Sequence, residues 1–387
     1  MLLFAALALF LTSATAVSVV GVRVSDISVV LFLTAILFFI IKNHTKKEFI
    51  DFKTSIIAAI LLCSILLSTV SQLYFGPNSF VINGISNAIS IPLGIIIAFF
   101  ILPRIDKNDL LAIIYKYNLI VILVCLTLYF YQSFFGALTW IELIDETNRY
   151  SALSLNPNQL ALYLLPIPFF VYIQYMLGGI GIRFAALQIS LVLLINYFAF
   201  GKGLFAAWFV GFAVFLLLGS YGKINKKILA IKMIFFTLLM PLIYFILSPL
   251  IVALYTGDAP GSMEGQGEGR IVLWMNGLSA WLDAPFLGHG PGHYSGHTTP
   301  FEGVEAHNFF IDWLAAYGVV GGMALLIFYL VLIKRTFTDE SWIILALYAS
   351  ILTQTLFHFY GRQPVYWLWW IVGYYLSIII SSKESKN

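Results

Sequence analysis

Apolar runs of about 20 residues, the length a helix needs to cross a lipid bilayer, recur throughout the 387-residue chain. Hydrophobic residues make up 61% of the chain and charged residues only 10%, whereas about a quarter of the residues in soluble domains are charged. Lipid offers the backbone no hydrogen-bond partners, so each span must satisfy its own polar groups. The chain is therefore expected to be all-α, a polytopic transmembrane helical bundle that forms a single membrane domain over residues 1–387.

The apolar runs predict about twelve helices, separated by short polar stretches. They cover about residues 2–20, 27–41, 54–74, 80–102, 110–135, 158–177, 184–200, 203–220, 233–254, 308–333, 341–358 and 365–381. Ala14-Thr15-Ala16 is similar to a signal-peptidase site, but no basic residue precedes the first run, which favours an uncleaved first helix.

Basic residues collect in alternate loops, which are cytoplasmic by the positive-inside rule. These residues are Lys42, Lys46, Lys47, Lys53, Arg104, Lys107, Arg183, Lys223, Lys226, Lys227, Lys232, Lys334, Arg335, Lys383 and Lys386. Lys116 falls near the inner end of the fifth helix, and the remaining basic residues, Arg23, Arg149, Lys202, Arg270 and Arg362, then face outward. Both termini are expected in the cytoplasm. Residues 255–307, between the ninth and tenth helices, form one large periplasmic loop.

This large loop is expected to fold and to carry the chemistry, because loops of its length between helices are uncommon unless they are functional. Residues 269–281 have the apolar spacing of a short amphipathic helix on the membrane surface, and Asp283-Ala284-Pro285 predicts where it stops. The predicted spans contain almost no ionisable residues, so no proton relay or ion path is visible. The polar residues of the loop therefore mark the expected site.

An ordered set of short motifs in the outward loops resembles the O-antigen ligase family, which includes Wzy-type polymerases. The motifs are Asn148-Arg149-Tyr150, Asn156-Pro157-Asn158-Gln159-Leu160-Ala161, Arg270 with Trp274, Ala284-Pro285-Phe286-Leu287-Gly288, Gly290-Pro291-Gly292, Ala306-His307-Asn308 and Gly318-Val319-Val320-Gly321. Family members usually carry an arginine in the hairpin between the seventh and eighth helices, where this chain has Lys202. Lysine can neutralise phosphate but lacks the planar fork of arginine.

The resemblance implies an inverting, C-type glycosyltransferase. It would move a glycan from a polyprenyl (undecaprenyl) diphosphate carrier to an acceptor hydroxyl on the periplasmic face of the bacterial inner membrane. The acceptor would be a further glycan, as in a polymerase of O-antigen or exopolysaccharide, or lipid A core, as in a ligase. A protein acceptor is a third possibility. Membrane lipids would be the other partners, with no nucleic acid and no cofactor.

The reaction needs cations for the leaving diphosphate and a proton acceptor for the attacking hydroxyl. Arg270 is the first candidate cation, followed by Lys202 and Arg149, with Arg362 as a weaker one that could instead pair with an outer carboxylate. His307 is the candidate base, since histidine has an unperturbed pKa of about 6.5. Catalysis is thus assigned to His307 and Arg270, and donor binding to the four cations.

Several other polar residues are expected to have structural rather than catalytic roles. Asn308 is expected to be structural, as the N-cap of the tenth helix, and Asp312 to be a favourable charge in its first turn. Glutamates of the outer loop, Glu264, Glu268, Glu302 and Glu305, are alternative bases or solvated charges. His289, His293 and His297 lie among glycines and Pro291, which disfavours a helix that would align them. No metal is therefore predicted.

A transporter or flippase of lipid-linked saccharides is the alternative of a different class. Such a protein would line its interior with cations across the membrane and would carry paired broken helices. The cluster of aromatic residues Tyr366, Trp367, Trp369 and Trp370 is expected to belong to an interfacial belt.

Overall fold

The computed structural model describes residues 2–12, 14, 18–19, 22–23, 27–32, 34, 52–75, 81–101, 105–135, 149–154, 156–199, 201–218, 263–292, 305–338 and 341–384. Its helices are α1 (Leu2–Leu11), α3 (Phe52–Phe75), α4 (Val81–Ile96), α5 (Lys107–Phe135), α6 (Pro157–Leu164), α7 (Ile167–Met176), α8 (Ile182–Phe198), α9 (Lys202–Leu218), α11 (Met263–Asp283), α12 (Phe309–Thr338), α13 (Trp342–Thr355) and α14 (Pro364–Glu384), with a π-helical turn, η2 (Ile97–Ile101), after α4. A short antiparallel hairpin pairs β1 (Ser18–Val19) with β2 (Val22–Arg23).

The prediction of a helical membrane protein is confirmed. Within the described ranges, four segments are long and apolar enough to cross a membrane: Lys107–Phe135, Pro157–Met176, Phe309–Phe337 and Pro364–Ser381. Shorter apolar helices, including Ile182–Phe198 and Lys202–Leu218, pack beside them. The expected ninth span, 233–254, lies outside the described residues, and the second, 27–41, lies largely outside them.

Small residues allow α9 and α13 to approach closely. The Ser350 hydroxyl donates a hydrogen bond to the Ala207 carbonyl oxygen at 2.7 Å. A Cβ atom placed on Gly211 would lie 1.9 Å from the Ser350 hydroxyl oxygen and 2.6 Å from the Ala346 carbonyl oxygen. Such glycine contacts are typical of helix pairs in membranes, where close packing replaces the hydrophobic effect.

The aromatic cluster at the start of α14 lies in the bundle interior, so the expectation of an interfacial belt is wrong. Tyr366, Trp367 and Trp370 are 0% exposed and Trp369 is 1% exposed. Two of the indoles find partners inside the protein: Trp367 donates to the Gly361 carbonyl oxygen at 2.7 Å and Trp369 to the Leu162 carbonyl oxygen at 3.0 Å. A belt would need these rings at the lipid boundary, whereas here they fill the space between helices.

Helix α12 is interrupted at Gly318, which has φ 60° and ψ −164°. The sequence alone predicts one continuous helix there, and the reason for the break is a loop that docks into it. The backbone N–H groups of His289 and Gly290 donate to the carbonyl oxygens of Ala315 and Ala316, at 2.9 and 2.8 Å. In return, Val319 and Val320 donate to the carbonyl oxygens of Pro285 and Phe286.

These bonds solve a problem that any broken membrane helix has, because backbone groups freed by the break must find partners within the protein. Ser68 of α3 adds a further bond, donating to the Ala316 carbonyl oxygen at 2.7 Å. The docked loop contains the motifs at residues 284–288 and 290–292, and the break contains the motif at residues 318–321. They form one structural unit, although about thirty residues separate them along the chain.

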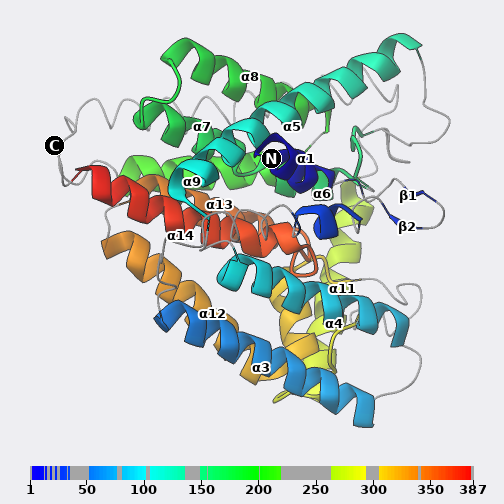
Figure 1. The fold of residues 1–387 in the computed structure, drawn as a ribbon. Coiled ribbons are helices and arrows are strands. Elements are labelled where there is room, and N and C mark those ends of the chain that lie inside the picture. The colour runs from blue at the N-terminus through cyan, green and yellow to red at the C-terminus, as the bar shows by residue number, and fades with distance from the viewer. Residues whose placement is uncertain are drawn as a thin grey trace.

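Helix α11 runs crosswise to α3 and α4, on the right-hand side of Figure 1, where α6 and the β1–β2 hairpin also lie. It ends at Asp283, as the sequence predicts, but begins earlier, at Met263. It packs on α12, and its Leu273 and Ala280 are buried. Ile271, Met275 and Leu282 are exposed, as expected for a helix at a membrane surface.

Candidate functional site

The first turn of α12 holds His307 in place. The side-chain oxygen of Asn308 accepts hydrogen bonds from the backbone N–H groups of Phe310, at 3.1 Å, and Ile311, at 3.4 Å, as expected for an N-cap. Buried Asp312 accepts the backbone N–H of Ala306 at 2.9 Å. His307 itself has φ 54°. Its imidazole is therefore presented by a tightly tied turn.

Positive φ is uncommon for residues other than glycine and costs on the order of 1–3 kcal/mol, which surrounding contacts must offset. Among the described non-glycine residues, only Ala152 and His307 have it. Ala152 lies in the segment that follows Arg149. Both strained positions thus fall in segments that the sequence singled out, and backbone strain of this kind clusters at functional sites.

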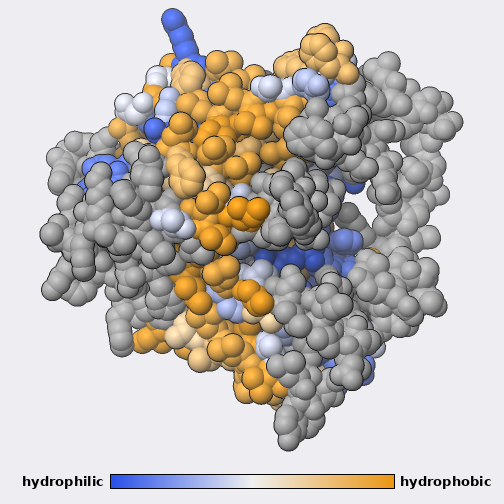
Figure 2. All heavy atoms as spheres, turned by 45° about the vertical axis from the view of Figure 1, so that its right-hand side comes forward, coloured by the Kyte–Doolittle hydropathy of each residue, from blue (hydrophilic) through white to orange (hydrophobic). Residues whose placement is uncertain are grey.

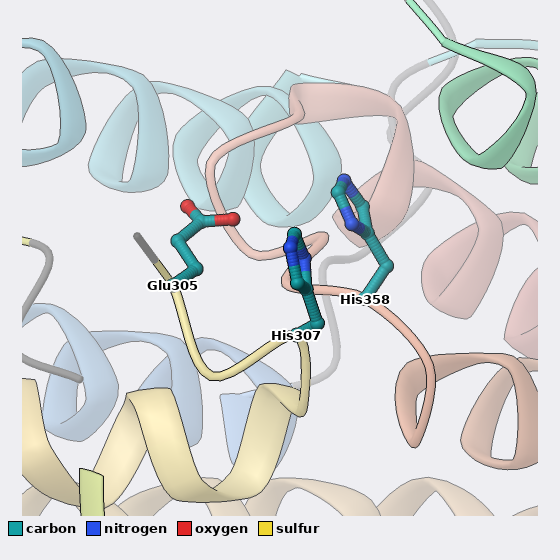
Figure 3. Close-up of side chains that lie close together, drawn as sticks. All are labelled: Glu305, His307 and His358. Atoms are coloured by element: carbon teal, nitrogen blue, oxygen red, sulfur yellow. The ribbon is translucent and has the colours of Figure 1, made fainter. Parts of the chain in front are cut away.

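Around His307, Glu305 and His358 complete a polar cluster (Figure 3). The His307 and His358 rings are nearly parallel, with centroids 5.5 Å apart and planes at 16°. The two imidazoles and the Glu305 carboxylate project to the same side. His307 comes from the turn before α12 and His358 from the loop after α13, so the fold joins two distant segments here.

Arg362 holds the carboxylate of this cluster. Its guanidinium donates to both oxygens of Glu305, at 2.5 and 3.2 Å. The Glu305 side chain is 6% exposed and that of Arg362 is 27% exposed. The pairing of Arg362 with an outer carboxylate, one of its two sequence interpretations, is therefore realised. Glu305 is buried and bound, unlike a solvated loop charge.

Tyr360 connects this cluster to the other parts of the site. Its ring meets the edge of His358 at a centroid distance of 4.9 Å. Its hydroxyl donates to the Asn158 carbonyl oxygen at 2.9 Å and accepts from the Gln354 amide at 2.8 Å. Burial raises the pKa of the Tyr360 phenol, although the Gln354 bond lowers it. The phenol thus stays protonated and keeps donating.

The hairpin between α8 and α9 presents Lys202 next to this connection. Asn196 closes the hairpin, because its side-chain amide donates to the Gly201 carbonyl oxygen at 3.3 Å. The side-chain oxygen of Gln354 would lie 3.3 Å from a Cβ atom on Gly203. Lys202 is exposed, and a side chain larger than hydrogen at Gly203 would crowd the end of α13.

Arg149 lies beside this hairpin. The backbone N–H of Tyr150 donates to the Phe198 carbonyl oxygen at 3.2 Å, and the Tyr150 phenol donates to the Cys125 carbonyl oxygen at 2.5 Å. The charges of Arg149 and Lys202 are close enough to repel each other. Two of the four expected donor cations are thus neighbours, which favours a site for a multiply charged anion.

Only some of the other candidate site residues from the sequence have described side chains. Arg270 lies in α11, but its side chain is outside the described residues, as are those of Glu264 and Glu268. His293, His297 and Glu302 also lie outside them. His289 is described, and a ring nitrogen contacts the Ala280 carbonyl oxygen at 2.7 Å. His289 thus anchors the docked loop.

His358 was missed by the sequence analysis, because it ends an apolar run and carries no motif. The predicted membrane topology nevertheless gave a signal for His358. The positive-inside rule puts this helix end on the outer side, together with Arg362, and an ionisable residue at such a place deserves attention.

By distance, Glu305, His307 and His358 could each offer one atom to a metal ion, since these atoms lie within 4.8 Å of one another. However, both oxygens of Glu305 are bound to Arg362. A divalent ion there would displace the guanidinium or lie against its positive charge, which is unfavourable in a buried setting. We therefore do not assign a metal site to this cluster.

Comparison with protein families adds to this geometry. Residues 189–326 match the family model described as O-antigen ligase. This stretch is similar to the O-antigen ligase family. The match includes the α8–α9 hairpin with Lys202, the helix that carries Arg270, the turn with His307 and Asn308, and the break at Gly318. Arg149, His358 and Arg362 lie outside it. No curated protein matches the chain.

The apolar helices characterise the chain as a multi-pass membrane protein, and its residues 189–326 are similar to the O-antigen ligase family. Figure 2, turned to bring the right-hand side of Figure 1 forward, shows hydrophilic atoms gathered near the middle of the visible face. Hydrophobic atoms cover the surface beside them, as a bilayer requires.

Proposed function

We propose that this protein transfers a glycan, with inversion, from a polyprenyl (undecaprenyl) diphosphate carrier to an acceptor hydroxyl at the periplasmic face of the inner membrane. The observation that carries the proposal is that a candidate base and candidate donor-binding cations belong to one site. His307 stands in a polar cluster with His358, which contacts Tyr360. Gln354, the partner of Tyr360, lies against the hairpin that carries Lys202, and Arg149 lies near Lys202.

In this reaction, the acceptor oxygen forms a bond to the anomeric carbon while the bond from that carbon to the carrier phosphate breaks. His307 takes the acceptor's proton. The diphosphate leaves with the bonding electrons, and Lys202, Arg149 and Arg270 oppose its growing negative charge. Because acceptor and leaving group occupy opposite faces of the sugar, a single displacement inverts the anomeric centre.

Arg362 has a different part in this scheme from the one the sequence suggested. Bound to Glu305, it shares its charge with a carboxylate. It contributes less to diphosphate binding than Lys202 and Arg149, and it holds Glu305 near His307. Asn308 keeps its structural role as the N-cap of α12.

We propose that the acceptor is a second carrier-linked glycan, so that the protein acts as a polymerase. A Gly-rich stretch such as residues 288–303 would suit a mobile cover over an extended glycan if it were open. Residues 288–292 do not fit this argument, because they are docked in the break of α12 through Gly288 and Gly290, and residues 293–303 lie outside the described chain. A ligase that transfers to lipid A core uses the same donor half of the site.

The test uses purified full-length protein and synthetic polyprenyl diphosphate repeat units. A polymerase makes a ladder of longer carrier-linked glycans from these units alone. If product forms only after lipid A core is added, the protein is a ligase. If neither mixture gives product while the purified protein is folded and monodisperse, transfer from a polyprenyl diphosphate donor is rejected.

A further inference from the structure

The hydroxyl of Tyr360 lies where three segments of the chain meet, and the residue is 0% exposed. The hydroxyl donates to the carbonyl oxygen of Asn158, in the first turn of α6, at 2.9 Å. It accepts from the side-chain amide of Gln354, near the end of α13, at 2.8 Å. The phenol uses its single O–H donor and one of its lone pairs in these bonds. This one group therefore joins α6, α13 and the loop before α14.

The two hydrogen bonds decide how the Gln354 amide is oriented. The Asn158 carbonyl can only accept, so the Tyr360 proton points to it, and the Gln354 group that faces the phenol must be the NH2 donor. The side-chain oxygen of Gln354 then faces the α8–α9 hairpin, where it would lie 3.3 Å from a Cβ atom on Gly203. Gln354 is 2% exposed, and this oxygen has no hydrogen-bond partner among the described residues. Tyr360 is therefore the group that fixes the amide.

This orientation matters for Lys202, the neighbour of Gly203 in the hairpin. An amide carries its negative end on oxygen, so the bound orientation turns a partial negative charge toward the segment that presents the lysine. The reversed amide would turn its positive NH2 end there instead. Because the charges of Arg149 and Lys202 repel each other, the negative end of a dipole beside the hairpin favours keeping the two cations together.

The other hydrogen bond of Tyr360 acts on the segment that carries Arg149. Asn158 lies where this segment has just turned into α6. At its other end, the segment is anchored to the end of α8 through the backbone N–H of Tyr150. Arg149 is therefore presented by a stretch of chain that is held at both ends, and the phenol supplies a hydrogen bond at one of them.

We propose that Tyr360 is a positioning residue for the donor-binding cations. Its hydroxyl acts through Gln354 on the hairpin that carries Lys202. It also acts through the start of α6 on the segment that carries Arg149. Its ring lies against the polar cluster around His307, so the base and the cations keep one spacing. The inference rests on the proposed function, in which these cations bind the leaving diphosphate, and it assigns Tyr360 no contact with substrate.

The test measures how tightly the purified full-length protein binds polyprenyl diphosphate without a glycan, the product of the donor half of the reaction. Tyr360→Phe keeps the ring and removes the hydroxyl. It should raise the dissociation constant about fivefold or more, as expected from the net contribution of a buried hydrogen bond. In transfer assays the same variant should raise the donor KM and leave kcat within about twofold, because His307 is untouched.

Tyr348→Phe is the matched control for the loss of a buried hydroxyl. Tyr348 lies in α13, as Gln354 does, and its hydroxyl donates to the Trp370 carbonyl oxygen at 2.8 Å. Its removal should leave the dissociation constant unchanged. An equal loss of affinity in Tyr348→Phe and Tyr360→Phe would overturn the inference, since any buried hydroxyl would then have the same effect.

A double variant separates positioning from folding. Tyr360→Phe leaves the Gln354 amide buried without its partner and should lower the melting temperature in detergent. The Tyr360→Phe, Gln354→Leu double variant replaces both partners by apolar groups and should recover most of that stability. Its dissociation constant should stay raised, because neither the amide oxygen nor the bond to α6 is restored. A purely structural role predicts that affinity returns together with the melting temperature.

The same measurements distinguish this inference from the proposed function. If wild-type protein binds polyprenyl diphosphate and both Tyr360 variants bind it equally well, only the role of Tyr360 falls. If the folded wild-type protein does not bind it, the proposed function fails, and this inference fails with it. If neither Tyr360 variant accumulates in folded form, the hydroxyl is a requirement for folding, and the positioning role is rejected.

Discussion

The imidazole rings of His307 and His358 lie face to face, with centroids 5.5 Å apart and planes at 16°. One precedes α12 and the other follows α13, so the contact joins two helix ends that the sequence separates by a membrane hairpin. Around this contact lie Glu305, paired with Arg362, and Tyr360, whose hydroxyl is bonded to Asn158 and Gln354. Substitutions at these residues can separate proton transfer from donor binding.

Replacement of His307 should abolish most of the transfer activity. His307→Asn is the sharper variant, because asparagine tolerates positive φ but cannot serve as a base. It should lower kcat/KM by about 10²- to 10⁴-fold, the usual contribution of a general base, while the protein still accumulates in the membrane. His289→Gln is the matched control and should stay near the wild-type rate. Near-normal activity of His307→Asn would return the role to a glutamate.

The charge of Lys202 should matter more than its shape. Lys202→Ala should lower kcat/KM for the donor by about tenfold or more, since it removes a cation that faces developing negative charge, whereas Lys202→Arg should retain most activity. The Arg149→Ala, Lys202→Ala double variant should lose less than the product of the two single effects, because both cations would hold one diphosphate. Lys334→Ala, at the other end of α12, is the charge control. A silent Lys202→Ala would exclude the hairpin from donor binding.

The pair of Glu305 and Arg362 should behave as a unit. Arg362→Met leaves a buried carboxylate unpaired and should destabilise the protein by about 1–3 kcal/mol, below the cost for a fully buried pair because Arg362 is partly exposed. The Glu305→Gln, Arg362→Met double variant should recover thermal stability in detergent. If it also recovers the donor KM, Arg362 acts through Glu305. A donor KM that stays raised in the double variant would show that Arg362 binds the diphosphate directly.

The break in α12 should tolerate no side chain at Gly318. A Cβ atom there would lie 2.3 Å from the Phe286 carbonyl oxygen, and φ is positive. Gly318→Ala should therefore cost about 3 kcal/mol or more. Gly322→Ala, on the same helix, meets only the end of the Leu314 side chain and should change stability by less than about 1 kcal/mol. Equal melting temperatures of the two variants would contradict the docked-loop arrangement.

Chelation should leave the transfer rate unchanged. The cluster of Glu305, His307 and His358 has suitable atoms, but Arg362 already occupies the carboxylate. Purified enzyme treated with EDTA and then dialysed should match untreated enzyme over the whole pH range. Loss of activity that returns with added zinc, and with no other divalent ion, would show that the cluster binds a metal after all.

The helices were predictable because they depend on local composition. An apolar stretch in lipid must form a helix to satisfy its own backbone, and charge asymmetry between loops sets which ends face outward. The N-caps are equally local: Asn156 caps α6 through the N–H of Gln159 at 3.0 Å, and Asn308 caps α12. The stop of α11 at Asp283 belongs to the same class.

The break in α12 could not be predicted from its own sequence, which is apolar and continuous through Gly318. Glycine permits the break, but only hydrogen bonds from the docked loop make it stable in a membrane. Similarly, Trp367 and Trp370 have the composition of an interfacial belt, and only packing against other helices reveals that they are buried.

The sequence by itself determined the class of the protein, a helical membrane protein whose motifs resemble those of the O-antigen ligase family. It also gave the candidate base and cations, because residue types and spans follow from local chemistry. The tertiary structure alone decided which candidates meet. Stacking of His358 on His307, the pairing of Arg362 with Glu305 and the approach of Arg149 to Lys202 all join segments far apart in the chain. Such contacts depend on how helices pack, and helix packing is a property of the whole bundle that no single stretch of sequence contains.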